Sequence, residues 1–501
     1  MDTFLQVFSF GNVAAAFVGT LVGVIMGMLP GLNGPIGVAL LLPFTFGMDV
    51  TTSLLLLGGL YMGSSYGGSI SAILLNAPGT EVAAATALEG YPMLLAGRGD
   101  EALRYSLMSS VYGGALGVLA LLFFTPILGR IGLQFGPPEM ALLALTGMAL
   151  IGMLSGRDLW LGLACGAFGV LISTVGQDIM SGQARNTFGS LDLEGGIGLV
   201  PALVGFFAVS EMLLQMLKPE DATINTLSEP KISYTEISRR IFCNYGRTFT
   251  KSSIIGIIIG VLPGAGAAIA TFIAYGEARR SSKTPELYGN GTPEGIVASE
   301  SSNNSCVSGA LVPLLALGIP GSTTCAIMYG ALTLHGIIPG PRLMQTSGDF
   351  VTVFMLGMGL TVIFMWLIGV FGLKLFSRVL KIPSRFLMPT ILMLCFLGSF
   401  SVNNSMFDVT LTVVFGLIGF LFKMIKLPVA PVVLGLILGP IAEEGIRQSI
   451  LMAKAQGVSL FMFVAQKPLI IGLFVVLLVL CLASVASFNK AAKMGADVSA
   501  E

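Results

Sequence analysis

Two short runs place proline, glycine and hydroxyl residues between apolar segments that would otherwise continue as helices. They are Pro78-Gly79-Thr80 and Pro320-Gly321-Ser322-Thr323-Thr324. Proline and glycine end one helix, and a hydroxyl residue can cap the next one. The start of that next helix presents unpaired N–H groups and about half a positive charge, which suits an anion. The runs therefore predict the tips of two re-entrant hairpins that hold an anion, with ordinary helix-to-helix turns as the alternative.

Polar residues also interrupt two of the apolar segments. They are Asn303, Asn304 and Ser305, with Ser64, Ser65 and Tyr66 at the corresponding place in the first half of the chain. Side-chain amides and hydroxyls donate to a carboxylate, and their oxygens can ligate a sodium ion. Hydrogen bonding between helices, at about 0.6 kcal/mol per contact in membranes, is the alternative role.

Two glycine-rich loops, residues 31–34 and 264–266, can bring backbone carbonyls or amides to a ligand. Close packing of helix backbones is the alternative role for these glycines. Asn33 stands where the second loop has Gly266, which leaves open whether this loop carries a side-chain ligand in one half only.

Few ionisable residues fall near these motifs. Glu300 precedes the Asn pair and is either a cation ligand, a proton carrier or an exposed carboxylate at a helix start. Glu81 is a second candidate proton carrier, while His335 is expected to be an interfacial or capping residue. Glu443 and Glu444 are expected to form a salt-bridged turn with Arg447 at the end of a short segment. Because neutral oxygens are abundant at both breaks and titratable groups are scarce, sodium is favoured over the proton as the coupling cation.

Two sets of ligands follow from these patterns. The predicted substrate ligands are Asn33, Ser64, Ser65, Tyr66, Pro78, Gly79, Thr80, Asn303, Asn304, Pro320, Gly321, Ser322 and Thr323. The predicted cation ligands are Gly31, Gly264, Gly266, Glu300, Ser305 and Thr324. We expect no cofactor and no resident metal, only a transported sodium ion or, alternatively, a proton.

Membrane helices must position these ligands. Only 10% of the 501 residues are charged and 54% are hydrophobic. Uncharged runs such as 351–372 and 469–488 can each cross a hydrocarbon core of about 30 Å. We therefore expect an all-α polytopic membrane protein with about twelve transmembrane helices. Segments 34–46 and 428–441 are short and are predicted to be half-helices or re-entrant pieces.

The main motifs occur twice, about half a chain apart. The run that begins at Gly27 recurs at Gly260, and the run that begins at Asn76 recurs at Gly318. Broken helices at matching positions of two halves are typical of secondary transporters. The expected organisation is a first membrane repeat at 1–217, a cytoplasmic linker at 218–251, a second membrane repeat at 252–489 and a polar tail at 490–501.

Charge bias predicts that the two repeats are inverted. Residues 277–283, after the second glycine loop, include three basic residues, whereas the equivalent residues 46–52 include none. Basic loops stay in the cytoplasm, so these two loops are expected on opposite sides of the membrane. The first basic residue is Arg98, so the N-terminus is expected to face outward and to lack the basic region of a cleavable signal peptide.

Composition and motifs argue against several other classes. A net charge of zero without a basic stripe argues against nucleic-acid binding. The chain has no phosphate-loop motif, no His-Glu-x-x-His motif and a single histidine, which argues against ATP hydrolysis and metal-dependent catalysis. The six cysteines lack paired spacing and are expected to be small packing residues. An anion-selective channel and an intramembrane enzyme stay as alternatives to a transporter.

Several long motifs resemble the large membrane subunit of the tripartite tricarboxylate transporter family over nearly the whole chain. They lie at 58–61, 66–79, 85–93, 300–304, 309–314 and 317–322. The resemblance implies a multi-pass protein of the bacterial inner membrane that takes up di- or tricarboxylates by cation symport, and that is not an enzyme. It also implies two partners, a small membrane subunit of about four helices and a periplasmic binding protein that delivers the substrate. Paired hairpins suit an elevator-like movement of a transport domain.

Overall fold

The computed structural model describes residues 2–29, 31–154, 159–178, 180–217, 232–262, 266–379, 384–467 and 470–472. Its regular structure is helical, apart from a two-residue antiparallel pairing of β1 (Gly176–Gln177) with β2 (Ala184–Arg185). The expectation of an all-α protein is therefore confirmed. The chain forms two compact units: unit 1 is Met1–Arg130 with Val200–Leu421, and unit 2 is Ile131–Leu199 with Phe422–Glu501. Each unit combines segments from both halves of the sequence.

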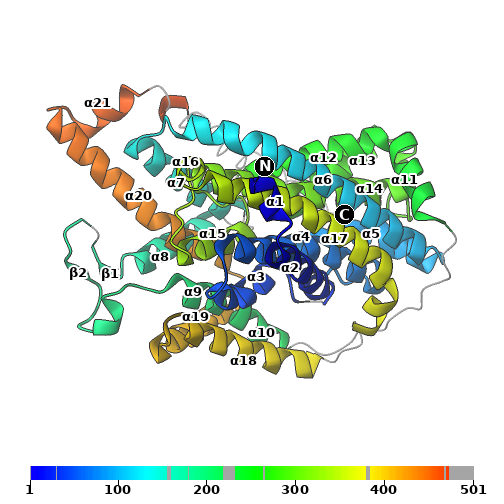
Figure 1. Cartoon of the computed structure of the whole chain (residues 1–501), viewed down its shortest axis with the longest axis horizontal. Coiled ribbons are helices and arrows are strands. Elements are labelled where there is room, and N and C mark those ends of the chain that lie inside the picture. The colour runs from blue at the N-terminus through cyan, green and yellow to red at the C-terminus, as the bar shows by residue number, and fades with distance from the viewer. Residues whose placement is uncertain are drawn as a thin grey trace, which may run out of the picture. The chain divides into compact units, whose positions relative to one another are not determined.

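Unit 1 contains most of the helices (Figure 1). They are α1 (Asp2–Val7), α2 (Phe10–Met28), α3 (Gly34–Leu41), η1 (Leu42–Thr45), α4 (Val50–Leu75), η2 (Glu81–Ala83), α5 (Ala84–Leu95), α6 (Gly99–Gly132), α9 (Leu199–Leu203), the π-helix η4 (Val204–Val209), α10 (Ser210–Gln215), α11 (Tyr234–Cys243), α12 (Gly246–Val261), α13 (Gly266–Ser281), η5 (Pro285–Leu287), α14 (Pro293–Leu317), α15 (Thr323–Leu334), α16 (Leu343–Thr346), α17 (Gly348–Val379), α18 (Ser384–Asn403) and α19 (Met406–Met424). The ends of α6 and α19, and the start of α9, cross the boundary between the units.

Unit 2 is smaller. Besides β1 and β2 it contains α7 (Pro137–Leu154), α8 (Leu159–Ser173), η3 (Leu191–Leu193), α20 (Val429–Ala455) and α21 (Leu460–Ala465). Helix α20 packs along both α7 and α8. Gly435 allows this contact, because a Cβ there would lie 2.1 Å from the carbonyl oxygen of Gly166.

Five helices among the described residues are long and apolar enough to cross a membrane. They are Phe10–Met28, Gly99–Gly132, Gly348–Gly372, Met406–Met424 and Val429–Ala455. Helices α4 and α14, with 26 and 25 residues, also exceed the length of about 20 residues that a span requires, but they carry more polar residues. The chain is a polytopic membrane protein. Its estimated number of about twelve spans stays a prediction.

The two predicted half-helices have different outcomes. Residues 34–46 form the eight-residue helix α3 followed by η1, so this prediction is confirmed. The prediction for 428–441 is wrong, because α20 continues from Val429 to Ala455. The charged residues that suggested a helix end are paired within unit 2, which lets the helix extend through them.

Glycines bring the central helices of unit 1 into close contact. Gly23 and Gly27 of α2 face α4, where a Cβ would lie 2.3 Å from the Leu60 carbonyl oxygen and 2.2 Å from that of Ser64. Such close backbone approach is typical of packed membrane helices. This close contact with α2 holds α4, which carries Ser64, Ser65 and Tyr66, in the interior of unit 1.

Candidate functional site

The polar residues of the two halves meet where α4 contacts α14. Residues 53–74 of α4 and 295–316 of α14 are all buried. The Asn303 amide nitrogen donates to the Ser65 carbonyl oxygen over 2.9 Å, and Ser69 Oγ donates to Glu300 Oε1 over 2.5 Å. From one contact to the other, the residue number increases along α4 (65 to 69) and decreases along α14 (303 to 300). The two helices therefore run antiparallel where they cross.

Both helices then end in the same way. Asn76 ends α4 in the left-handed conformation, with φ 53°, and Gly318 ends α14 with φ 75°. Pro-Gly follows in each case, and then Thr80 or Ser322 in extended conformation. We call residues 76–80 the first break and residues 318–322 the second break. The helices that follow, α5 and α15, have 12 residues each, about 18 Å at 1.5 Å per residue, and are too short to span alone.

The Ser322 hydroxyl of the second break makes two hydrogen bonds. Ser322 Oγ accepts from the Cys325 amide over 3.2 Å, which caps α15. It also shares a hydrogen bond of 3.0 Å with the Tyr61 hydroxyl on α4. In the first break, Thr80 makes no side-chain cap, and its buried Oγ1 has no partner among the described residues.

Further buried polar atoms near the helix crossing lack a partner within the described part of the chain. They include Tyr66 Oη, Ser302 Oγ, Asn303 Oδ1 and Asn304 Oδ1. The Asn304 amide nitrogen is engaged with the Met62 carbonyl oxygen at 3.2 Å, so its free atom is an acceptor. Buried polar groups nearly always find partners, so these unsatisfied atoms of α4 and α14 indicate that a ligand or water supplies them.

Glu300 lies at the centre of a second polar cluster. Its carboxylate is fully buried and accepts from Ser69, Thr86 and Ser110, which lie on α4, α5 and α6. The Ser110 bond measures 2.7 Å, and Thr86 Oγ1 also lies 2.8 Å from Ser299 Oγ. The alternative of an exposed carboxylate at a helix start is therefore wrong, because α14 begins two turns earlier at Pro293.

A second carboxylate fixes the short helix that carries Thr86. Glu89 on α5 is fully buried and accepts from the backbone amides of Gly291 at 2.9 Å and Thr292 at 2.8 Å. The Tyr275 hydroxyl donates to it over 2.7 Å. These bonds tie α5 to the loop that precedes α14, and so hold Thr86 against Glu300.

Some of the other predicted ligands lie close together. A Cβ on Gly34 would come 2.7 Å from Ser64 Oγ and 3.5 Å from Thr324 Oγ1, so the first glycine loop, α4 and the start of α15 are neighbours. Gly31 has φ +88°, which favours glycine, and Asn33 caps α3 by accepting from the Ile36 amide at 3.2 Å.

Other predicted ligands are engaged elsewhere. Ser305 Oγ donates to the Ser253 carbonyl oxygen on α12 at 3.0 Å. Both Ser64 and Ser65 donate to the Tyr61 carbonyl oxygen. Gly266 begins α13, whereas Gly264 lies outside the described residues. Pro78 is exposed and Thr323 is partly exposed, next to the buried Thr80 and the half-buried Ser322.

The sequence did not single out Tyr61, Ser69, Thr86 or Ser110. Serine and threonine within apolar helices usually donate to their own helix backbone, so nothing local distinguishes these hydroxyls from packing residues. Ser69 lies one helical turn after Ser65, and that spacing is the single signal that could have found it.

The close contacts of the first half recur in the second. Gly27 of α2 meets Ser64 of α4, and Gly260 of α12 meets Cys306 of α14. The breaks follow the same pattern, since a Cβ on Gly79 would lie 1.9 Å from the Gly27 carbonyl oxygen and one on Gly321 2.6 Å from that of Gly260. Each break therefore rests on the glycine-rich helix of its own half.

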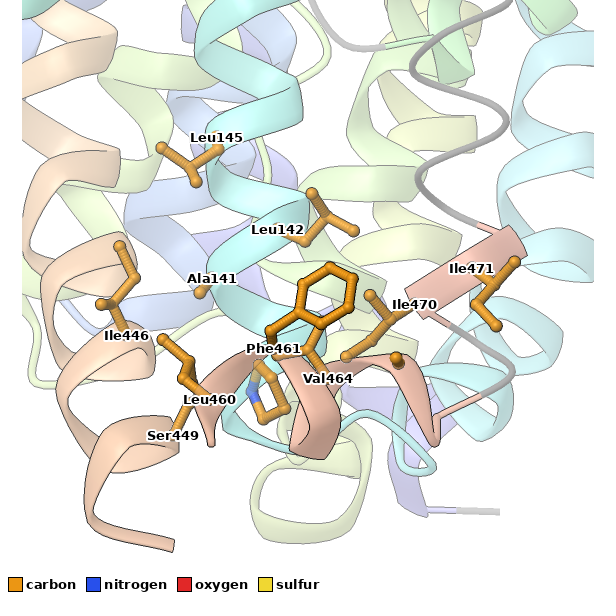
Figure 2. Close-up of a pocket in the computed structure, with 12 residues that line it drawn as sticks. Ala141, Leu142, Leu145, Ile446, Ser449, Leu460, Phe461, Val464, Ile470 and Ile471 are labelled. Carbon is orange, nitrogen blue, oxygen red and sulfur yellow. The ribbon is translucent and has the colours of Figure 1, made fainter. Parts of the chain in front are cut away.

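Unit 2 has a different chemistry. A cavity of about 410 Å³ lies among α7, α20 and α21, and its lining is apolar apart from Ser449, whose hydroxyl donates to its own helix (Figure 2). Such a lining offers no charged or free polar group to a carboxylate.

An ion-pair cluster joins the β1–β2 loop to α20 in unit 2. Arg447 lies 2.6 Å from both Asp178 and Glu443, and Arg185 pairs with Glu443 at 2.6 Å. The predicted pairing of Arg447 is confirmed for Glu443, with two further members, whereas Glu444 accepts from Gln448 on its own helix. Backbone amides, above all that of Ser181, together with Arg447, hold the pKa of the Asp178 carboxyl well below its usual range.

Two smaller expectations are also settled. His335 is the C-cap residue of α15, as predicted. Cys165, Cys306, Cys325 and Cys395 are buried packing residues, whereas Cys243 is exposed and Cys481 lies outside the described residues.

A buried pair of broken polar helices within an apolar helical protein is the arrangement expected of a membrane transporter. The chain belongs to the tripartite tricarboxylate transporter TctA family, whose model matches residues 13–434. It is similar to an "uncharacterized 52.8 kDa protein in TAR-I ttuC' 3'region" of Agrobacterium vitis, with 35% identity over 448 residues that cover 88% of each chain. An "uncharacterized protein in TAR-II ttuC' 3'region" of the same organism is 34% identical over 204 residues, 40% of this chain and 82% of the relative. No solved structure matches the chain significantly.

Membership of this family makes the chain the large membrane subunit of a tripartite tricarboxylate transporter. It confirms the predicted resemblance and the expectation that the protein is a transporter and not an enzyme.

Proposed function

We propose that the protein takes up di- or tricarboxylates by symport with a cation, and that this cation is sodium. The observation that carries the proposal is the buried, unpartnered Thr80 hydroxyl beside a broken helix, in a unit whose helices α4 and α14 hold further unsatisfied polar atoms among the described residues. A carboxylate that leaves water needs donors to replace its hydration shell, because an uncompensated buried charge costs many kcal/mol. Hydroxyls and the N–H groups at the starts of η2, α5 and α15 are such donors.

The substrate site that we propose comprises the predicted ligands around both breaks and the helix crossing. Thr80 and Tyr66 donate through free hydroxyls, and Asn303 has a second N–H beyond the one bound to Ser65. Asn33 and Ser322 contribute less directly, since each uses its side-chain oxygen to cap a helix.

We further propose that residues 1–217 and 252–489 are inverted repeats. Two observations support this organisation. The Gly27–Ser64 and Gly260–Cys306 contacts occupy equivalent places in the two halves. The equivalent helices α4 and α14 cross antiparallel, as a two-fold axis in the membrane plane requires. With the hairpins moving as one body, an elevator-like transition would carry the site across the membrane.

The proposed setting is the bacterial inner membrane, with the basic linker at 218–251 in the cytoplasm. Family membership supports two partners, a small membrane subunit and a periplasmic binding protein that delivers the carboxylate. The absence of a phosphate-loop motif from the sequence supports an ion gradient as the energy source.

Uptake by the three proteins reconstituted in liposomes tests the proposal. We expect labelled tricarboxylate to accumulate when sodium is higher outside, at fixed pH and in the presence of a protonophore. Passive equilibration that ignores every gradient would indicate a channel, and chemical change of the substrate would indicate an enzyme. Uptake that ignores sodium and collapses with the proton gradient would replace sodium by the proton.

A further inference from the structure

We propose that the Glu300 carboxylate and the hydroxyls around it form the sodium site that couples transport to the ion gradient. The inference rests on the proposed function and deepens it, because it assigns the cation to side chains that the sequence patterns did not bring together. Ser69, Thr86, Ser110 and Ser299 complete the site.

The cluster has the ligand chemistry of a site for a hard cation. It offers two carboxylate oxygens of Glu300 and four hydroxyl oxygens from α4, α5, α6 and α14. Hard cations take oxygen ligands of this kind, and each hydroxyl can turn its lone pairs toward an ion instead of donating its proton. All five side chains are at most 1% exposed.

Charge balance selects a monovalent cation. No described Lys, Arg or His side chain pairs with Glu300, so its negative charge has only hydroxyl dipoles for compensation. An unpaired charge at this depth is costly and marks an ion pathway in membrane proteins. One sodium ion neutralises one carboxylate, whereas a divalent ion would leave a net positive charge.

The position of the cluster explains coupling to the anion. Ser69 follows Ser65 by one helical turn on α4, and Glu300 precedes Asn303 by one turn on α14. The cation site and the Asn303–Ser65 contact therefore lie on adjacent turns of the same helix pair. A cation that draws Ser69 and Glu300 together fixes the crossing on which the carboxylate site is built.

The test removes one oxygen ligand at a time. Thr86→Val keeps the side-chain shape but loses the hydroxyl, Thr86→Ser keeps the hydroxyl, and Ser110→Ala removes a ligand from a different helix. The matched control is Thr361→Val, because Thr361 on α17 is equally buried and its hydroxyl donates only to its own helix, to the Met358 carbonyl oxygen at 2.7 Å.

Two quantities are measured on the full-length protein. The first is the sodium concentration for half-maximal uptake by the reconstituted system. The second is the rise in melting temperature that sodium produces in the purified chain, which reports binding without transport. Thr86→Val and Ser110→Ala should raise the half-maximal concentration by about tenfold or more, the equivalent of about 1.4 kcal/mol. Both variants should also lose most of the sodium-induced rise in melting temperature, while Thr86→Ser and Thr361→Val retain it.

The outcomes separate the site from the function. An unchanged sodium response in Thr86→Val and Ser110→Ala, in a protein whose uptake follows sodium, would overturn the site and leave the proposed function intact. A purely structural cluster would lower the melting temperature of these variants without a change in half-maximal sodium. Wild-type uptake independent of sodium would overturn the function itself. If uptake is driven by the proton gradient and Glu300→Gln uncouples it from that gradient, the Glu300 carboxylate carries a proton and the sodium site is overturned.

Discussion

The break after α4 and the break after α14 follow the same backbone path but use their hydroxyls differently. Both begin at a left-handed residue, Asn76 or Gly318, and continue through Pro-Gly. Ser322 then caps α15 and bonds Tyr61, whereas Thr80 leaves its buried hydroxyl without a partner in the described part of the chain. The second break therefore uses its hydroxyl to fix local structure, whereas the first leaves its hydroxyl as an available donor.

The two breaks also differ in how tightly they are packed. A Cβ added at Gly79 would lie 1.9 Å from the Gly27 carbonyl oxygen, whereas one added at Gly321 would lie 2.6 Å from the Gly260 carbonyl oxygen. A Cβ on Gly321 would also lie 2.7 Å from the Ala310 carbonyl oxygen, but the first break has the closest single contact and the free hydroxyl. We expect substitutions there to affect transport most.

The largest expected effect is a labelling pattern that is all or none. If the two halves are inverted, cysteines introduced at Thr51 and Ser282 should react with an impermeant thiol reagent from opposite sides of the membrane. The background must lack the six native cysteines. Labelling of both positions from the same side would show that the breaks enter the membrane in the same direction, and the inverted repeat would be abandoned.

Of the two substitutions Gly79→Ala and Gly321→Ala, the first should be the more damaging to folding. Its Cβ would overlap the Gly27 carbonyl oxygen, and such overpacking costs about 1–3 kcal/mol or more. Membrane abundance and melting temperature should fall, and should fall less for Gly321→Ala. Gly276→Ala on α13 is the control, because a Cβ there meets nothing within 4 Å. Equal losses at Gly79 and Gly321 would remove the packing difference between the breaks.

Thr80→Val and Ser322→Ala should separate binding from stability. Loss of the Thr80 donor to a buried carboxylate costs about 1–3 kcal/mol, a fall in affinity of roughly 5- to 150-fold, while the melting temperature stays near that of the wild type. Ser322→Ala loses a helix cap worth about 0.5–2 kcal/mol, so its melting temperature should fall. Uptake kinetics and thermal unfolding measure the two effects. The comparison fails if Thr80→Val transports with unchanged affinity.

The smallest effect is expected far from both breaks in the sequence. Cys481 belongs to a terminal apolar run, and its change to alanine should leave the affinity and rate of uptake nearly unaltered. A marked loss in this variant, at normal membrane abundance, would indicate that transport defects do not report specifically on the breaks.

The sequence predicted those features that depend on residues within one or two helical turns. The half-helix α3, the cap at Ser322 and the C-cap at His335 follow from local propensities. The failure at 428–441 has the same origin, because Arg185 and Asp178 on a distant loop add to the Glu443–Arg447 pair within α20, and these distant partners are not visible in the local sequence.

By itself the sequence determined that this is an apolar, helical chain of a known transporter family, with two similar proline-glycine runs between its helices. Periodicity, composition and motifs are short-range or additive properties, so they can be read without coordinates. Only the tertiary structure decided which hydroxyl is free and which is engaged, and that Ser69, Thr86 and Ser110 surround Glu300. The physical reason is that a buried polar atom takes whatever partner the packing brings within about 3 Å, and for Glu300 those partners come from the other half of the chain.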